Sequence, residues 1–230
     1  MTDDPLRLVV FDVDGTLVDS QQQILAAMCA AFQALDYPMP SRSEVLSIVG
    51  LSLPVAMATL APDLSDAAQA ELVNGYKHSF MTTRQNGGAQ AHAPLYPYVR
   101  EMIARLSSAP GILMGIATGK SRRGLDHLLE SHALQDVFVT QQVADHHPSK
   151  PHPSMLHTCL SDTGVQAEHS VMIGDTEFDI EMGRAAGFHT IGVSWGYHDR
   201  ARLCAGGADQ IIDDFRVLPE VLFSLWGTHL

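Results

Sequence analysis

Two carboxylates one residue apart, Asp12 and Asp14, follow an apolar run at residues 8–11 and precede Gly15. The apolar run is typical of a buried strand, and the glycine after it allows the chain to turn. Ligand crevices of open α/β sheets form at the carboxyl ends of the strands. Carboxylates placed there can act as nucleophiles and as proton donors or acceptors. A helix cap or a turn would need only one aspartate, so the pair predicts an active site.

Two later segments add groups that can bind an anion. Thr118 and Gly119 follow a strand predicted at residues 112–117, and a hydroxyl with backbone N–H groups at such a turn can cradle a phosphoryl group. A plain helix start explains the same segment equally well. Lys150 lies in the run Ser-Lys-Pro-His-Pro, in which two prolines restrict the backbone. A lysine is more often a solvated surface residue, but one held in this way can neutralise carboxylate and phosphoryl charge.

A second pair of aspartates predicts a metal site. Asp175 follows a strand predicted at residues 170–173, and Asp179 lies four residues later, on the first turn of a helix. The helix dipole alone would explain Asp179 but not Asp175. Carboxylates about 4 Å apart repel by roughly 4 kcal/mol per pair at an effective dielectric constant of about 20, so several in one crevice need a cation. Oxygen ligands select Mg²⁺ over softer metals. We therefore expect Mg²⁺ bound by Asp12, Asp14, Asp175 and Asp179, with Asp14 contributing its main-chain carbonyl.

The elements that must position these residues alternate in the second half of the chain. Strands are predicted at 8–11, 112–117, 137–140, 170–173, 189–193 and 210–212, and helices at 99–106, 122–131, 154–160, 178–186 and up to 226. Strands that alternate with helices indicate βαβ units and a parallel sheet.

The first half of the chain is different, because four helices are predicted in succession, at 20–35, 43–49, 53–60 and 66–83. Ser20 is the expected N-cap of the first of them. About 70 helical residues do not fit a simple crossover between parallel strands. We therefore expect an α/β fold, a Rossmann-like parallel sheet core with an inserted all-helical cap domain. The core is expected to comprise residues 1–17 and 92–230, and the cap residues 18–91. An ordinary helical subdomain without a gating role is the alternative.

Composition narrows the possible partners and the compartment. The formal net charge is −12, which argues against nucleic acid and against an anionic membrane surface. No apolar stretch approaches the roughly 20 residues that a bilayer requires. Three widely spaced cysteines argue against a disulfide framework or a zinc site. With an acidic N-terminus and no visible signal peptide, the chain is expected to be cytoplasmic, as a monomer or a homodimer.

Four motifs in order resemble those of the haloacid dehalogenase superfamily. They are Asp-Val-Asp-Gly-Thr-Leu at 12–17, Thr-Gly at 118–119, Lys-Pro-His-Pro at 150–153, and Gly-Asp at 174–175 with Asp179. The runs at 14–20, 193–197 and 205–209 are similar to those of its phosphoglycolate phosphatase-like subfamily. The run Pro-Leu-Tyr-Pro-Tyr at 94–98 departs from the subfamily's usual Pro-Tyr-Pro-Gly, which leaves phosphoglycolate itself open as the substrate.

The resemblance implies a role for each matched residue. Asp12 is the expected nucleophile, and Asp14 the acid and base that protonates the leaving group and then activates water. Thr118 and the Gly119 amide are expected to hold the phosphoryl group, and Lys150 to offset its charge. Ser52, in a loop between two predicted helices, is expected to face the leaving group. The residues expected to contact substrate are therefore Gly15, Gly119, Lys150 and Ser52.

The same motifs leave several activities to be compared. Dehalogenases of the superfamily lack the second aspartate of the first motif, and phosphonatases replace it, so Asp14 argues against both. A Mg²⁺-dependent phosphatase acting on a small phosphorylated metabolite is favoured. A phosphomutase of the β-phosphoglucomutase type, a pyrophosphatase and a non-enzymatic binding module are the alternatives. His146 and His147, close to Lys150, are expected in a solvated loop, and a position at the entrance of the site is the alternative.

Overall fold

The centre of the computed structural model, which describes residues 5–85 and 93–227, is a parallel sheet of six strands. The strands are β1 (Arg7–Phe11), β2 (Ile112–Thr118), β3 (Thr140–Val143), β4 (Ser170–Gly174), β5 (His189–Val193) and β6 (Gln210–Ile212). Their order across the sheet is β3-β2-β1-β4-β5-β6. In the central strand β1, Phe11 pairs with Ile116 of β2 on one side and with Ile173 of β4 on the other. The chain order reverses at β1, and ligand crevices form at such a switch point.

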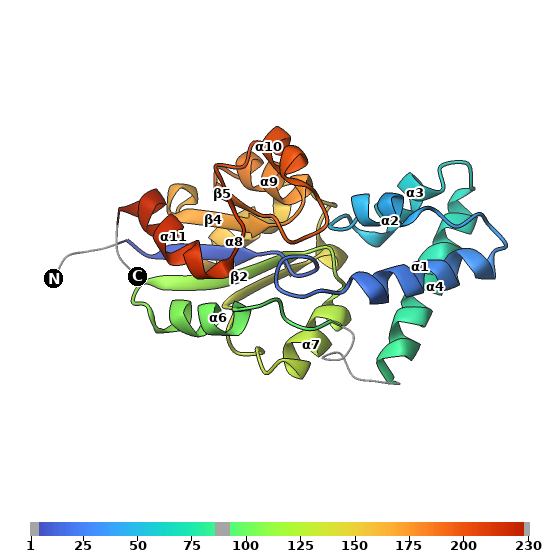
Figure 1. Cartoon of the computed structure of the whole chain (residues 1–230), viewed down its shortest axis with the longest axis horizontal. Coiled ribbons are helices and arrows are strands. Elements are labelled where there is room, and N and C mark those ends of the chain that lie inside the picture. The colour runs from blue at the N-terminus through green and yellow to red at the C-terminus, as the bar shows by residue number, and fades with distance from the viewer. Residues whose placement is uncertain (1–4, 86–92, 228–230) are drawn as a thin grey trace.

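Alternate side chains of β1 enter two different hydrophobic cores, one on each face of the sheet. Val9 and Phe11 point into a core shared with α6 (Val99–Ser108), α7 (Arg122–Ser131) and α11 (Leu218–Trp226). Leu8 and Val10 point into a core shared with α8 (Ser154–Thr163) and α9 (Glu177–Ala185). Figure 1 shows α6 and α9 on opposite sides of the sheet. Because both faces of the sheet are covered, β1 is apolar without interruption from Leu8 to Phe11. The predicted α/β class is confirmed.

The remaining helices are α1 (Gln21–Ala34), α2 (Arg42–Ser47), α3 (Leu53–Leu60) and α4 (Asp66–Gln85) between β1 and β2, and α10 (Arg200–Gly206) after β5. None of the helices described is both long enough and apolar enough to cross a membrane.

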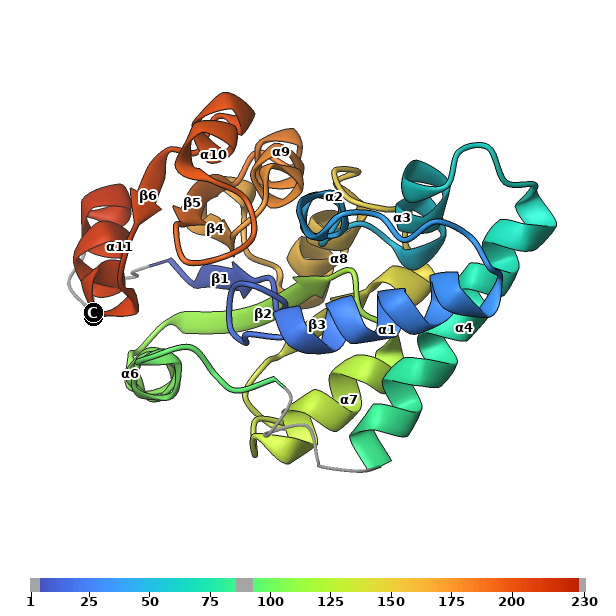
Figure 2. The same ribbon diagram turned by 45° about the vertical axis from the view of Figure 1, so that its right-hand side comes forward.

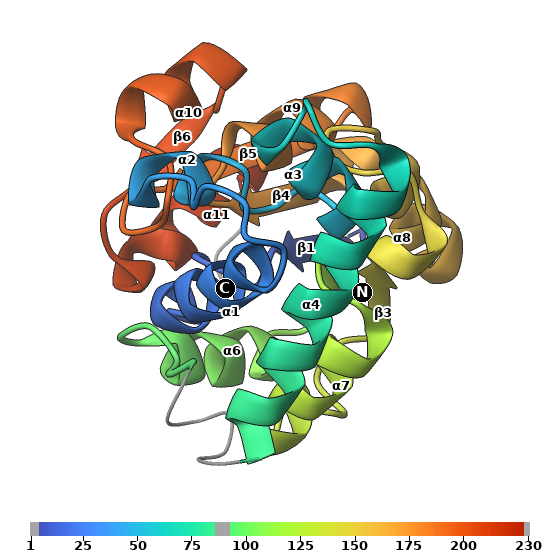
Figure 3. The same ribbon diagram turned by 90° about the vertical axis from the view of Figure 1, so that its right-hand side faces the viewer.

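The helices α1–α4 form what we call the helical block, which has a hydrophobic core of its own. Phe32 of α1, Met57 of α3 and Leu72 of α4 are fully buried in it. The helices α1 and α4 pack closely, since a Cβ on Gly75 would lie 3.3 Å from the Cα of Ala31. The block lies beyond the carboxyl ends of the strands, as Figure 2 shows from the side and Figure 3 from the end.

The helical block is connected to the sheet by two segments that lie side by side, at residues 18–19 and 94–95. Val18 forms an isolated bridge with Leu95, and the Asp19 amide donates to the Pro94 carbonyl at 2.9 Å. The predicted boundary between residues 17 and 18 falls beside this bridge. The predicted boundary between residues 91 and 92 lies outside the described residues. The assignment of the block as a separate cap domain stays a prediction.

The strand predicted at residues 137–140 is wrong by three residues. The strand is Thr140–Val143, which pairs with β2 from Gly115 onward. Phe138 is instead a loop residue that packs edge-on against Phe11, with ring centroids 6.4 Å apart. A strand at the edge of a sheet needs few apolar residues, so β3 itself is mostly polar. The apolar residues before it, Val137 and Phe138, lie outside the strand and pack into the hydrophobic core on one face of the sheet.

The helix α10 (Arg200–Gly206) was not predicted. It has seven residues and buries only Leu203, so its apolar periodicity is too weak to detect. The Asp199 carboxylate accepts from the Arg202 amide and caps its N-terminus.

We expect Leu72→Ala to destabilise the protein by about 2–5 kcal/mol, because it leaves a cavity in the core of the helical block. Urea unfolding measures the change. Glu71→Ala, at an exposed neighbouring position on α4, is the matched control and should change stability by less than about 0.5 kcal/mol. Equal effects of the two substitutions would contradict a packed core in the block.

Candidate active site

Three carboxylates converge where β1 and β4 end. Asp12 directly follows β1, and its amide donates to the Ile173 carbonyl at 2.9 Å. Asp175 directly follows β4, and Asp179 lies on the first turn of α9. The three carboxylates each place an oxygen within 4.8 Å of the others, and all three residues are buried. Burial with so little separation makes mutual repulsion the main electrostatic feature of this cluster.

Lys150 is the cation inside the cluster. Its Nζ is 2.8 Å from Oδ1 of Asp12 and 2.6 Å from Oδ1 of Asp179, and the residue is 2% exposed. One ammonium therefore faces two of the three carboxylates. Oδ2 of Asp12 has no hydrogen-bond partner among the described residues. A buried carboxylate oxygen without a donor is energetically costly, so it indicates a ligand position.

Burial and the neighbouring charges shift the pKa values of Asp12, Asp175 and Lys150. Burial raises the pKa of Asp12 to about 7 although Lys150 opposes the shift, and the charge of Asp179 adds to it. Burial, with the neighbouring Asp179 and Asp12, also raises the pKa of Asp175 well above its ordinary range. Burial alone would lower the pKa of Lys150, but its ion pairs with Asp12 and Asp179 outweigh burial and raise it. The cluster therefore lacks positive charge, and its all-carboxylate donor set fits a hard divalent cation.

Hydrogen bonds from neighbouring side-chain and main-chain donors fix the carboxylates of Asp175 and Asp179. Oδ1 of Asp175 accepts from the Thr16 hydroxyl at 2.8 Å, and Oδ2 accepts from the Tyr197 amide at 2.9 Å. Gly15 has a positive φ of 86°, and a Cβ there would lie 2.2 Å from Oδ2 of Asp175. The predicted turn at Gly15 is therefore also the place where the Asp12 loop packs against Asp175. Oδ2 of Asp179 accepts from the Thr176 amide at 3.1 Å, which completes a capping box on α9.

Asp14 lies beside the carboxylate cluster, not in it. Its Oδ1 pairs with Lys120 Nζ at 2.8 Å and accepts from the Ser20 hydroxyl. Ser20 occupies the predicted N-cap position of α1, but its side chain makes no capping hydrogen bond to the helix and donates to Asp14 instead. The Ser20 Oγ lies 3.0 Å from the Tyr197 hydroxyl as well. Asp14 is thus oriented by Ser20, from the loop after β1, and by Lys120, from the end of β2. Tyr197, from the loop after β5, lies next to Ser20.

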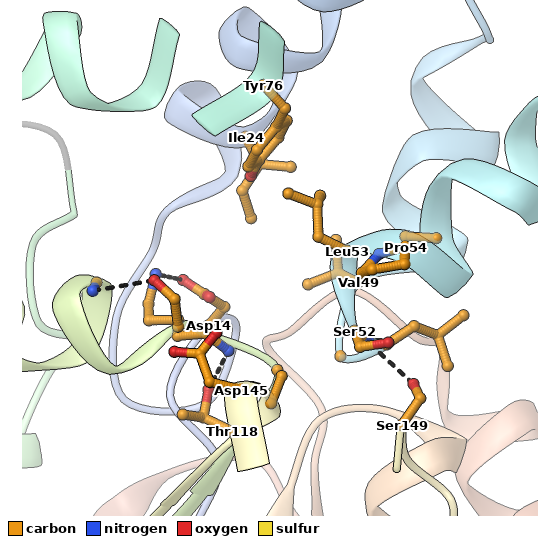
Figure 4. Close-up of a pocket in the computed structure, with 18 of the residues that line it drawn as sticks. Asp14, Ile24, Val49, Ser52, Leu53, Pro54, Tyr76, Thr118, Asp145 and Ser149 are labelled. Atoms are coloured by element: carbon orange, nitrogen blue, oxygen red, sulfur yellow. Dashed lines mark hydrogen bonds and ion pairs between the residues drawn. The ribbon is translucent and has the colours of Figure 1, made fainter. Parts of the chain in front are cut away.

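A cavity of about 740 Å³ opens between this cluster and the helical block (Figure 4). Asp12 and Asp14 lie on its wall with Thr118 and Gly119, whereas the other cluster residues lie deeper. The Thr118 hydroxyl accepts from the Lys120 amide at 3.3 Å, which leaves its proton free to donate. A Cβ on Gly119 would lie 2.8 Å from the Gly50 and Leu51 carbonyls of the helical block.

Ser52 lies on the cavity wall, but its amide is already used. That amide donates to the Ser149 Oγ at 2.8 Å, so it connects the helical block to the core (Figure 4). Only the Ser52 hydroxyl is left for the predicted contact with substrate. The ring of His147 also lies on this wall, held 2.8 Å from Ser154 Oγ and 3.0 Å from Gln142 Oε1. The expectation of a solvated loop is therefore wrong for His147.

Two residues of the site were not predicted from the sequence. Lys120, two residues after Thr118, pairs with Asp14, and the Thr-Gly-Lys order was the available signal. Tyr197 contributes its amide to Asp175 and its hydroxyl near Ser20. It comes from a loop remote in sequence, and nothing in its local pattern indicates that place.

Comparison with known proteins agrees with the geometry. A protein-family model described as haloacid dehalogenase-like hydrolase matches residues 9–193. A phosphoglycolate phosphatase of Vibrio parahaemolyticus is 31% identical over 96% of this chain and 98% of its own. A probable phosphatase, IndB, of Dickeya dadantii is 35% identical over 90% of each chain. A solved haloacid dehalogenase-like family hydrolase of Streptococcus pneumoniae superposes with a TM-score of 0.81 at 25% identity, covering 96% of this chain and 99% of its own.

The raised pKa of Asp12 predicts how a divalent cation changes stability with pH. The folded pKa is about 7 and the unfolded one about 3.9. Between these pH values the folded chain keeps a proton that the unfolded chain has lost, so the stability from this group falls as pH rises through this window. A cation binds the ionised form, so added Mg²⁺ should stabilise the protein more at about pH 7.5 than at about pH 5.5.

Thermal unfolding with Mg²⁺ or with EDTA at each pH measures this effect. At about 100 times its Kd the ion contributes about 2.7 kcal/mol, which raises the Tm by roughly 5–10 °C. Asp175→Asn should reduce the rise at both pH values. A rise that is larger at the lower pH, or is absent, would contradict a cation site at the cluster.

Proposed function

Because the chain belongs to the haloacid dehalogenase-like hydrolase family and is a phosphatase, we propose that it hydrolyses a small phosphorylated metabolite through an aspartyl-phosphate on Asp12, with Mg²⁺ as cofactor. The observation that carries the proposal is the buried Oδ2 of Asp12, which lacks a partner among the described residues. Asp12 also lies on the wall of a cavity large enough for a phosphate ester. A nucleophile needs an uncommitted lone pair that faces its substrate, and Asp12 has one.

In the first step an Asp12 oxygen attacks phosphorus, and the bond between phosphorus and the ester oxygen breaks. The Asp14 carboxyl gives its proton to that leaving oxygen, which departs as an alcohol. The Thr118 hydroxyl and the Gly119 amide hold the phosphoryl oxygens. Lys150, 2.8 Å from Asp12, orients the nucleophile and offsets the charge that develops around it.

In the second step a water molecule attacks the phosphorus of the aspartyl-phosphate, and Asp14 takes up the proton that this water loses. The bond between phosphorus and the Asp12 oxygen breaks, inorganic phosphate leaves, and Asp12 is a free carboxylate again. The contact of the Asp14 side chain with Lys120 Nζ at 2.8 Å holds its carboxyl group at the cavity.

The carboxylates of Asp12, Asp175 and Asp179 and the main-chain carbonyl of Asp14 would hold the Mg²⁺ ion. Bound there, the ion supplies positive charge that favours the approach of an anionic phosphate to an anionic nucleophile. The protein contributes the geometry: Thr16 and the Tyr197 amide fix Asp175. The relative from Vibrio parahaemolyticus bears the name phosphoglycolate phosphatase, which supports a small phosphate monoester as the substrate class.

Asp12→Asn should abolish phosphate release from every ester tested, because an amide oxygen is too weak a nucleophile. Stability should change little, since the side chain keeps its volume. Phosphate release is measured with Mg²⁺ and with chelator over phosphoglycolate, sugar phosphates, pyridoxal phosphate and pyrophosphate. Rapid quench of the wild type should show the mass of one phosphoryl group on the peptide that contains Asp12. Turnover by the variant at the wild-type rate would overturn the mechanism, and phosphoryl transfer without release would indicate the mutase.

Asp14→Asn should lower kcat by about 10²–10⁴-fold on alkyl esters, with a much smaller change in KM, because it removes proton transfer. With p-nitrophenyl phosphate, whose leaving group needs no proton, the variant should release one equivalent of nitrophenolate in a burst and then stall. Stopped-flow absorbance measures the burst. A loss confined to KM, or no burst, would contradict the role given to Asp14.

A further inference from the structure

The helical block lines the cavity above Asp14 with an apolar wall. The residues of this wall are Ile24, Met28, Val49, Leu53, Tyr76 and Phe80. In Figure 4, Ile24 and Tyr76 come from one side and Leu53 with Val49 from the other, and the space between them leads down toward Asp14. The rings of Tyr76 and Phe80 stack with centroids 5.7 Å apart, which makes one side of the wall broad and flat.

The core presents a different surface to the same cavity. Its contributions beside Asp12 and Asp14 include Thr118, Gly119, Lys120, Ser121, His147 and Ser149. Ile24, Met28 and Val49 of the wall are buried, whereas Leu53, Tyr76 and Phe80 are half-buried and face mostly polar groups across the cavity. A closer approach of the two surfaces would set apolar groups against polar ones and satisfy neither. A ligand with an apolar part, placed between them, would bury the wall.

The charges around the wall exclude a small anionic leaving group as its natural partner. Among the side chains that the structure describes, Lys77 is the cation that the helical block contributes to the cavity, and it is exposed. Lys120 is paired with Asp14 at 2.8 Å, and Arg123 is exposed. Lys120 lies over the ring of Phe80, 5.3 Å from its centroid, but its charge is already paired with Asp14. A carboxylate pressed against the wall would lose its hydration and gain no unpaired buried cation among the described cavity residues, which is costly. The volume of about 740 Å³ also exceeds by far what a two-carbon acid fills.

We propose that the apolar wall of the helical block binds an apolar or aromatic leaving group, so that the substrate is the phosphate monoester of a bulky, uncharged alcohol. This inference rests on the proposed hydrolysis of phosphate esters and adds the class of alcohol. The phosphoryl group lies at Asp12 and Thr118, and the alcohol oxygen beside Asp14. The carbon skeleton extends from there between α1, α3 and α4.

The n-alkyl phosphates from propyl to octyl test the inference, because they share one reaction and nearly one leaving-group acidity. Burying a methylene is worth about 0.8 kcal/mol, so kcat/KM with Mg²⁺ should rise about fourfold per added carbon until the wall is covered. Hexyl phosphate should then exceed phosphoglycolate by at least about tenfold. A flat or falling series, or phosphoglycolate as the best substrate, overturns the inference and leaves the phosphatase intact. Absence of phosphate release from every ester, p-nitrophenyl phosphate included, defeats the proposed function itself.

A pair of variants on α3 locates the effect. Leu53→Ser removes apolar surface from the wall and should lower kcat/KM for hexyl phosphate about tenfold, with propyl phosphate changed by less than about twofold. Val55→Ser is the matched control, since Val55 is 41% exposed on the same helix and does not line the cavity. It should change neither ester by more than about twofold. Equal losses on both esters from Leu53→Ser, or the same losses from Val55→Ser, overturn the assignment of the wall.

Discussion

The repulsion among Asp12, Asp175 and Asp179 is the constraint on which the rest of the structure depends. Their carboxylate oxygens lie within 4.8 Å of one another, and among the described residues Lys150 is the one ammonium ion-paired within the cluster. Such an arrangement persists only where the surrounding fold holds each group in place. The carboxylates even occupy space that side chains would otherwise need, since a Cβ on Gly196 would lie 2.1 Å from the Cβ of Asp175. The uncompensated charge of the cluster is also the basis on which a cation is proposed there.

The sequence was informative about the three carboxylates because each lies directly after a buried parallel strand or on the first turn of the helix that follows it. Such strands are apolar without interruption, so residues 8–11 and 170–173 indicated where the chain changes from core to crevice. The carboxyl ends of neighbouring parallel strands lie at the same edge of a sheet. Asp12 and Asp175 could therefore be placed together from the sequence alone. The family resemblance added roles that spacing alone does not supply.

The remaining features depend on contacts between segments far apart in the chain. The hydrogen bond from Ser20 to Asp14 replaced a local helix cap, and the ion pair of Lys120 with Asp14 joins two different strand ends. No local pattern favours these partners over solvent. The edge strand β3 (Thr140–Val143) is polar at its centre, and its neighbour Phe138 packs from a turn, so apolarity was misleading there. The cavity wall likewise exists only when α1, α3 and α4 have packed.

The separate hydrophobic core of the helical block has a consequence for how this enzyme can diversify. The block is packed around Phe32, Met57 and Leu72, in a core separate from the two cores on the faces of the sheet. Substitutions at positions that lie far apart and share no contact partners are close to additive in their effects on stability. Residues of the wall such as Leu53 and Val49 can therefore be exchanged in a lineage while the charge cluster is inherited unchanged. Selection for a new alcohol and preservation of the phosphoryl chemistry act on different parts of the chain, so new substrates can be acquired without rebuilding the reaction.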